Sequence, residues 1–287
     1  MNLWVSDVDP GMERLTEAEF KAVASRFKIY FEEFGLPLPA FPGKFQSRFE
    51  KQVEAVLRCK PAVFSFIFGV PDKSILKECQ RLNIKAVGSA TTLEEAVLLQ
   101  DAGVDAIIAS GSEPGGHKPS FLRPAVESLT MLDDLVQELR TGIRIPFVAA
   151  GGIVDGKKIN TLMNAGADGV QLGTAFLACD EPGATATHRT LLLSDAIHHT
   201  VLSSCWTGRL GSMIENRLTT ELISDAEFLP FPIQNSLTKP LKEMAAATGV
   251  PNMANYWCGQ CRQDASLEKK NATSLLNQLV KEMESGI

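Results

Sequence analysis

The sequence lacks the features that mark membrane, nucleic-acid-binding and secreted proteins. No apolar run reaches the ~18 residues that cross a bilayer, and no lysine and arginine cluster offsets the net charge of −6, which argues against a nucleic-acid surface. The first ten residues have neither the basic start nor the apolar core of a signal peptide. Six cysteines without framework spacing in 287 residues are typical of a reducing compartment. We therefore expect a cytoplasmic protein with small-molecule partners and with no nucleic-acid or membrane partner.

Metal ligands are also scarce. Cys258-Gly-Gln-Cys261 has no second cysteine pair and no histidine at ligand spacing, so a zinc site is not expected. No thioredoxin-like context surrounds the pair, which we interpret as packing residues. Of the four histidines, His188, His198 and His199 lie in helical or pre-helical sequence, which favours structural roles. We predict that the chain holds no metal.

What the sequence does contain is a regular alternation of short apolar runs and amphipathic helices. Residues Thr92 and Asp155 are suited to cap two of these helices. The junction DAGVDAII (101–108) has an echo in NAGADGVQL (164–172), each joining a helix end to a strand. The runs predict six strands, at 2–5, 62–68, 84–88, 106–109, 146–150 and 169–172. This pattern predicts an α/β fold with a parallel (β/α) sheet or barrel, two strands short of a TIM-type barrel of eight.

The residues after 179 are more than one closing helix requires. Within them, 191–202 and 272–283 are predicted to be helical, and 230–240 is predicted to be a Pro-bounded loop. We therefore expect a barrel portion over 1–179 and a C-terminal helical extension over 180–287. The extension is expected to pack on one mouth of the barrel rather than to form a separate domain.

Glycines close two consecutive predicted strands. Gly151-Gly152 follow the run 146–150, and Gly173-Thr174 follow the run 169–172. Glycine backbone leaves N–H groups free to face an anion, and phosphate is the ligand that such groups commonly bind. One such ending would be explained by a tight turn, whereas two in succession favour a phosphate cradle.

The loop ASGSEPGGHKPS (109–120) leaves a predicted strand at the end where barrel active sites lie. Gly115-Gly116 lets the backbone approach a flat ligand, and His117 follows directly. An ordinary histidine pKa of ~6.5 suits a general base at neutral pH, so we predict a catalytic role for His117. Glu113 is a candidate partner of His117, and a solvated loop carboxylate is an equal alternative.

Several motifs, taken in order, resemble the nitronate monooxygenase family, formerly called 2-nitropropane dioxygenase. The similarity extends across nearly the whole chain. The motifs are NLWV (2–5), FSFIFGVP (64–71), ASGSEPGGH (109–117), AAGGIVDG (149–156), GADGVQLGTAFLA (166–178), SSCWTGR (203–209), PIQNSLTKP (232–240) and YWCGQ (256–260).

The resemblance implies a TIM barrel that holds FMN without a covalent bond. It places Asn2 in contact with the flavin, and Ser110 and Gly115 near the ring and the ribityl chain. His117 corresponds to the family's active-site histidine, which assists removal of the proton alpha to a nitro group. The residues implied to hold the phosphate are Gly152, Gln171, Leu172, Gly173 and Thr174.

The implied reaction is oxidation of an alkyl nitronate, or of a neutral nitroalkane, with O2 to a carbonyl compound and nitrite. Ser110 departs from the glutamine that the family often has there. NLWV (2–5) matches the family's third strand, so we expect an N-terminally incomplete barrel with six of eight strands, and we expect a homo-oligomer. Two alternatives stay open: an FMN-dependent enoyl-thioester reductase that uses NAD(P)H, and an inactive flavin-binding remnant.

Overall fold

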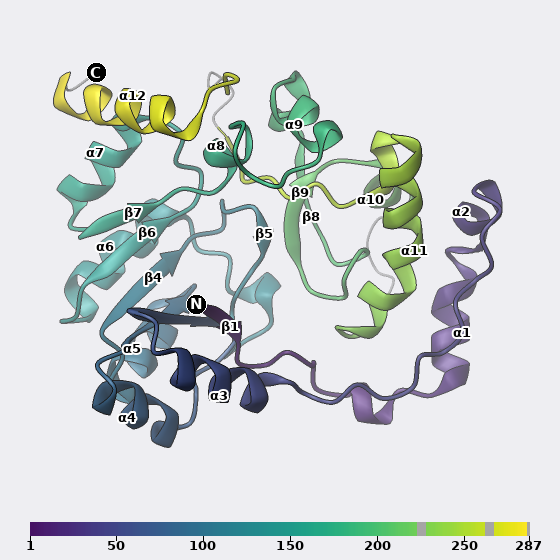
Figure 1. The fold of residues 1–287 in the computed structure, drawn as a ribbon, viewed down its shortest axis with the longest axis horizontal. Helices are drawn as coiled ribbons and strands as arrows, with labels where there is room; N and C mark the ends of the chain where they lie inside the picture. Colours follow the sequence, from purple (N-terminus) through teal and green to yellow (C-terminus); the bar gives the residue numbers. More distant parts are fainter. Residues whose placement is uncertain (223–227, 262–266, 286–287) are drawn as a thin grey trace.

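The main body of the protein is a parallel sheet of six strands (Figure 1). The computed structural model describes residues 1–222, 228–261 and 267–285. All six strands predicted from the sequence are confirmed. They are β1 (Asn2–Trp4), β2 (Val63–Ile67), β3 (Lys85–Ala90), β4 (Ala106–Ser110), β6 (Phe147–Ala150) and β7 (Gly169–Gln171), paired in the order β1-β2-β3-β4-β6-β7. Within the described residues β1 pairs only with β2 and β7 only with β6, so these six strands form an open sheet.

Helices that alternate with the strands cover one face of the sheet (Figure 1). Residues at alternate positions of a strand point to opposite faces, so that Phe64 and Phe66 of β2 are fully buried beneath the helices. Val63, on the opposite face of the same strand, is 42% exposed. The helices are α3 (Phe49–Cys59), α4 (Lys73–Arg81), α5 (Leu93–Ala102), α6 (Leu132–Gly142) and α7 (Gly156–Ala165). The apolar residues buried between the sheet and these helices form the first core, which holds the six strands in place.

The predicted caps of these helices are present. Asp155 caps α7 by accepting from the Lys158 backbone N–H, and Thr92 caps α5 by accepting from the Glu95 backbone N–H. The Glu95 side chain is fully buried. Its carboxylate accepts from the backbone N–H groups of Thr91, at 2.7 Å, and of Phe121, at 2.6 Å. Glu95 thereby ties the loop after β5 (Gly116–His117) to the start of α5.

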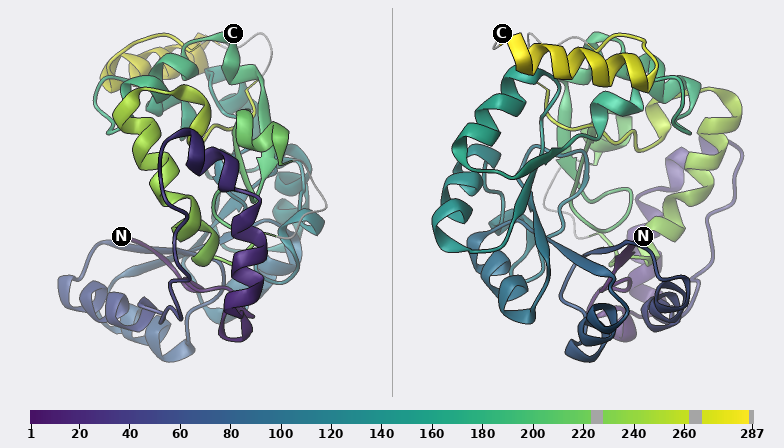
Figure 2. Two further views of the ribbon diagram at one scale, coloured as in Figure 1. Left: turned by 90° about the vertical axis from the view of Figure 1, so that its right-hand side faces the viewer. Right: turned by 60° about the vertical axis from the view of Figure 1, so that its left-hand side comes forward.

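A second core joins an N-terminal segment, residues 8–45, to a C-terminal segment, residues 201–257. The helices α1 (Glu17–Ser25) and α2 (Lys28–Glu33) pack beside α11 (Ile233–Thr248), as both views in Figure 2 show. Its largest buried side chains are Phe20, Phe27, Phe31 and Trp206. This core supports a small antiparallel sheet in which β9 (Gly211–Ile214) lies between β5 and β8 (Thr200–Ser203).

Two predictions for the C-terminal part are wrong. Instead of one helix over 191–202, the chain forms α9 (Ala186–Leu192), a short 3₁₀ turn and then β8, because Thr200–Ser203 pair with β9. Instead of a loop, 230–240 holds the start of α11, with Pro240 inside it. Ile233, Leu237 and Leu241 recur every four residues and are fully buried, and this packing outweighs the local cost of the proline. The C-terminal part is therefore mixed rather than purely helical.

The last helix agrees with the sequence prediction for 272–283. It is α12 (Ala272–Ser285), which lies across α7 in Figure 1. Leu275 and Leu279 enter the first core, and the Glu282 carboxylate accepts from the Gly156 backbone N–H at 2.8 Å. No helix in the described part of the chain is both long and apolar enough to cross a bilayer.

Candidate active site

A cavity of about 150 Å³ lies at the carboxyl ends of β6 and β7. We call it the cradle cavity. Of the predicted site residues, it brings together Gly115, Gly152, Gln171, Gly173 and Thr174, which come from three separate segments. The remaining lining residues are Pro114, Ala150, Gly151, Ile153, Val154, Leu177, Trp257, Gly259 and Cys261. Two consecutive strand ends thus contribute to one cavity, as their glycines predict.

The close packing around the cradle cavity requires several of these glycines. Gly152 has a φ of 62°, in the left-handed region. A Cβ on Gly115 would stand 2.7 Å from the Gly259 backbone nitrogen. At Gly173, by contrast, nothing lies within 4 Å of the Cβ position, so the backbone there borders open space. The Thr174 hydroxyl oxygen accepts from the Gly259 N–H at 2.9 Å, which joins the C-terminal segment to the strand end.

Three other predicted site residues lie outside this lining. Ser110 is buried at the end of β4 and pairs in register with Ala150, one strand away from the cavity wall. Leu172 packs against the first core. Asn2 lies on β1, where its side-chain amide donates to the Ser65 hydroxyl at 3.0 Å and borders a different cavity.

His117 lies on β5 within a cluster of aromatic rings. Its imidazole is 4.8 Å from the ring of Trp257, which lines the cradle cavity. It stands edge-on to Trp4 at 5.3 Å and to Phe68 at 6.3 Å, and Phe231 closes the cluster at 6.5 Å. The histidine is therefore held by packing between the sheet and the second core.

The surroundings of His117 keep it neutral. Burial, and then the nearby positive charges of Arg209 and Lys242, lower its pKa from 6.5 to about 4. The ordinary pKa expected from the sequence is wrong for this environment. Nε2 lies 2.8 Å from the Thr207 hydroxyl oxygen. The same hydroxyl donates to the Arg209 carbonyl at 3.2 Å, so Thr207 connects the imidazole to the backbone of the Arg209 segment.

Glu113 takes neither of the two roles considered for it. Its carboxylate is buried and accepts from the Leu132 backbone N–H at 3.0 Å. The neighbouring Lys118 is also buried, and its Nζ donates to the carbonyls of Ser112, at 2.8 Å, and Pro114, at 2.5 Å. Burial lowers the pKa of Lys118 to about 8. The two charged groups fasten the loop that carries His117.

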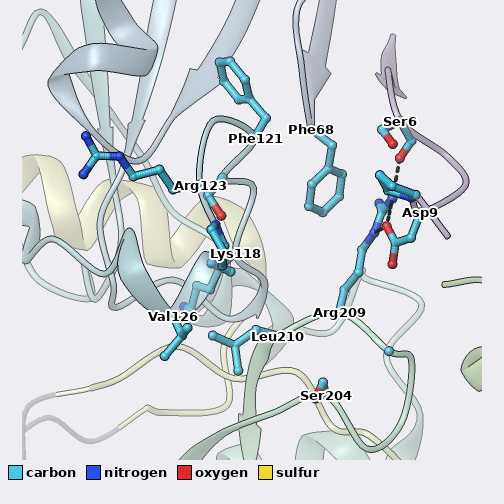
Figure 3. A pocket seen from close by; sticks show the side chains of 15 residues that line it. Ser6, Asp9, Phe68, Lys118, Phe121, Arg123, Val126, Ser204, Arg209 and Leu210 are labelled. Atoms are coloured by element: carbon cyan, nitrogen blue, oxygen red, sulfur yellow. Dashed lines mark hydrogen bonds and ion pairs between the residues drawn. The ribbon is translucent and has the colours of Figure 1, made fainter. Parts of the chain in front are cut away.

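A larger cavity of about 650 Å³, which we call the outer cavity, is lined by Phe68, Lys118 and Arg209 among others (Figure 3). Figure 3 shows Arg209 reaching toward Asp9 with Phe68 beside it, and Lys118 on the opposite side. The guanidinium of Arg209 stacks 4.1 Å from the Phe68 ring, and its Nε donates to Asp9 at 2.7 Å. Its Nη1 is buried and has no hydrogen-bond partner among the described residues. Arg209 ends the motif SSCWTGR (203–209), but no local pattern in the sequence marks it as a site residue.

The fold is α/β, and the cradle cavity lies where two parallel strands end in glycine, which is the edge at which open α/β sheets bind their ligands. A sequence profile of the nitronate monooxygenase family matches residues 14–282. The chain therefore belongs to this family of flavin-dependent oxidoreductases.

Similar proteins agree with this membership. A probable nitronate monooxygenase of Staphylococcus aureus (strain MRSA252) is 32% identical over 275 residues, which are 94% of this chain and 77% of that protein. The structure of a nitroalkane oxidase from Streptomyces ansochromogenes has a TM-score of 0.89 and 30% identity, covering 99% of this chain and 80% of that one. FabK from Thermotoga maritima has a TM-score of 0.70 at 21% identity, covering 94% and 82%, and this likeness concerns the fold alone.

Proposed function

We propose that the protein binds FMN with its phosphate in the cradle cavity and oxidises alkyl nitronates with O2 to a carbonyl compound and nitrite. The observation that carries this proposal is the convergence of Gly115, Gly152, Gln171, Gly173 and Thr174 on one cavity. These positions come from separate motifs, and the family resemblance implies each of them for the flavin.

The residues present fit a phosphate group. The Gly173 backbone borders open space in the cradle cavity. Gly152, whose φ lies in the left-handed region, forms a turn in the wall of the same cavity. Such side-chain-free turns bind anions through their N–H groups. A cavity of about 150 Å³ exceeds by roughly tenfold the ~10–15 Å³ that one water requires. We propose that Ser110 supports the flavin from the end of β4, and that Asn2 and Leu172 act through the sheet that shapes the site.

The chain's own residues would bind, orient and neutralise the substrate. FMN, when bound, would supply the redox chemistry between the nitronate and O2. A nitronate is an anion, and Arg209 and Lys118 give the outer cavity positive charge next to the aromatic cluster. His117, neutral at pH 7, offers a hydrogen-bonding imidazole between the two cavities.

The pKa of His117 bears on which substrate is used. A base is most effective when its pKa lies near the working pH, and a pKa of about 4 leaves His117 a weak base. This favours nitronates, which have already lost the alpha proton, over neutral nitroalkanes. We propose that His117 is the proton acceptor in whatever nitroalkane turnover occurs.

We test the proposal by reconstituting the purified protein with FMN and supplying an alkyl nitronate under air. We expect a flavin absorption spectrum that survives gel filtration, and nitrite release in step with nitronate loss. A protein that retains FMN but releases no nitrite would contradict the proposed reaction. A protein that retains no FMN would contradict the proposed cofactor.

The enoyl-thioester reductase alternative predicts a different response. An enzyme of that kind bleaches its bound flavin rapidly when NADPH is added without O2. The likeness to FabK supports the fold only, so we expect bleaching by a nitronate and no rapid bleaching by NADPH.

The remaining assignments are also proposals. We propose a TIM-type barrel portion over 1–179 and an extension over 180–287, which contributes Trp257 and Gly259 to the cradle cavity. The six free thiols are consistent with a cytoplasmic location.

A further inference from the structure

Two cysteines stand side by side at the wall of the cradle cavity. The side chains of Cys258 and Cys261 are close enough to shift the pKa of each other's thiol. Both sulfurs also approach the Gly259 carbonyl oxygen, Cys258 Sγ at 3.3 Å and Cys261 Sγ at 3.6 Å. Cys258 is fully buried, whereas Cys261 lines the cavity. The spacing C-x-x-C therefore places one accessible thiol and one protected thiol within reach of each other.

We propose that Cys258 and Cys261 are a redox pair that hydrogen peroxide converts to a reversible intramolecular disulfide. The Cys261 thiolate attacks one peroxide oxygen, which breaks the O–O bond, forms a sulfenic acid and releases hydroxide. The Cys258 sulfur then attacks the sulfenic sulfur, which breaks the S–O bond and expels the second oxygen. Two thiols and one peroxide thus yield one disulfide and two waters.

The electrostatics of the pair agree with this division of roles. The interaction with the Cys258 side chain lowers the pKa of the Cys261 thiol. The same interaction, followed by burial, raises the pKa of Cys258. Because the thiolate is the nucleophile, Cys261 is the thiol that reacts with peroxide and Cys258 is the thiol that resolves the product.

The other four cysteines lack such a partner in the structure. Cys59 is exposed and single. Cys79, Cys179 and Cys205 are buried, and burial raises the pKa of each thiol. They therefore provide internal controls for oxidation at 258–261.

The disulfide would act on the cradle cavity through the tetrapeptide that carries it. The Gly259 N–H donates to Thr174 at 2.9 Å, and the Gln260 N–H donates to the Glu113 carbonyl at 2.8 Å. Drawing the two sulfurs together moves Gly259 and removes the Cys261 thiol from the wall. We therefore expect oxidation to weaken phosphate binding, and by reciprocity a bound phosphate to slow oxidation. This coupling rests on the proposed function, whereas the disulfide itself does not.

The experiment uses the full chain carrying Cys59→Ser, which removes the exposed thiol that would link two molecules. The flavin-free protein is treated with hydrogen peroxide, and free thiols and cross-linked peptides are followed by mass spectrometry. We expect a 258–261 cross-link that dithiothreitol reverses, while Cys205 stays reduced. We also expect FMN affinity to fall about tenfold on oxidation, the effect of losing one good hydrogen bond, and FMN or inorganic phosphate to slow cross-linking.

Single variants separate the two thiols. Cys258→Ala should leave a sulfenic acid on Cys261 that dimedone traps, whereas Cys261→Ala should leave Cys258 unmodified. No cross-link, or oxidation of Cys205 at the same rate, would overturn the redox pair. A cross-link that leaves FMN affinity and phosphate protection unchanged would overturn its coupling to the cavity. If the reduced protein binds no FMN, the proposed function fails, and the cross-link still decides the redox pair.

Discussion

Replacing His117 with asparagine should change how the stability of the protein depends on pH. The pKa of His117 falls from 6.5 to about 4 on folding, mainly because burial disfavours the charged imidazole. The unfolded chain therefore binds a proton between these values that the folded protein does not. Above pH 6.5 both states are neutral, so the full stability is present there. It is lost progressively as the pH falls toward 4, by roughly 3 kcal/mol at 1.36 kcal/mol per pKa unit.

The assay is urea unfolding of the flavin-free wild type and His117→Asn at several values between pH 4 and 8. We expect the free energy of unfolding of the variant to rise relative to wild type as the pH falls through this window. Lys118 and Lys242 also have lowered pKa values, of about 8. These two lysines make stability depend on pH only between about pH 8 and pH 10.5. That range lies above the pH 4 to 8 of the assay, so the lysines do not affect the comparison. Parallel stability curves for the two proteins would refute the buried, neutral histidine.

Three further predictions concern stability, substrate choice and assembly. Glu95→Gln should lower the free energy of unfolding by ~2–3 kcal/mol, because two or more buried N–H groups lose a charged acceptor; an unchanged urea midpoint would contradict this. With full flavin occupancy, His117→Asn should slow turnover of a neutral nitroalkane by ~10²-fold, the low end for a general base because the pKa of His117 is about 4, and should spare the nitronate; equal losses in kcat/KM would instead assign His117 to binding. The edge strands β1 and β7 each pair with one neighbour in the described residues, so we expect association in sedimentation experiments; a monodisperse monomer at high concentration would contradict it.

The parts of the fold that the sequence predicts well are those with local signals. Each of the six parallel strands is a short apolar run, and buried parallel strands need no partner-specific pattern to be visible. The glycine endings at Gly152 and Gly173 are similarly local. Their meeting at one cavity follows from the rule that parallel strands end at the same edge.

The features that the sequence does not predict depend on distant contacts. β8 exists because it pairs with β9, and α11 continues through Pro240 because its apolar face is buried in the second core. The low pKa of His117 results from burial and from Arg209, more than ninety positions away in the chain. Local propensity contains none of this information, which is why a helix, a loop and an ordinary pKa were expected instead.

The most direct test of the proposed FMN site compares two glycine-to-aspartate variants. Gly173 lines the cradle cavity, nothing lies within 4 Å of its Cβ position, and its φ of −119° suits any residue, so the backbone has room for aspartate at this wall. Gly183 also has open space around its Cβ position but lies outside that cavity, so Gly183→Asp is a control with the same change of charge.

The measurement is the FMN dissociation constant of wild type, Gly173→Asp and Gly183→Asp, with circular dichroism to show that each is folded. We predict that wild type and Gly183→Asp bind FMN alike, and that Gly173→Asp loses binding because its carboxylate repels the phosphate and blocks the backbone N–H groups. Binding of FMN by folded Gly173→Asp at wild-type affinity would contradict the phosphate site.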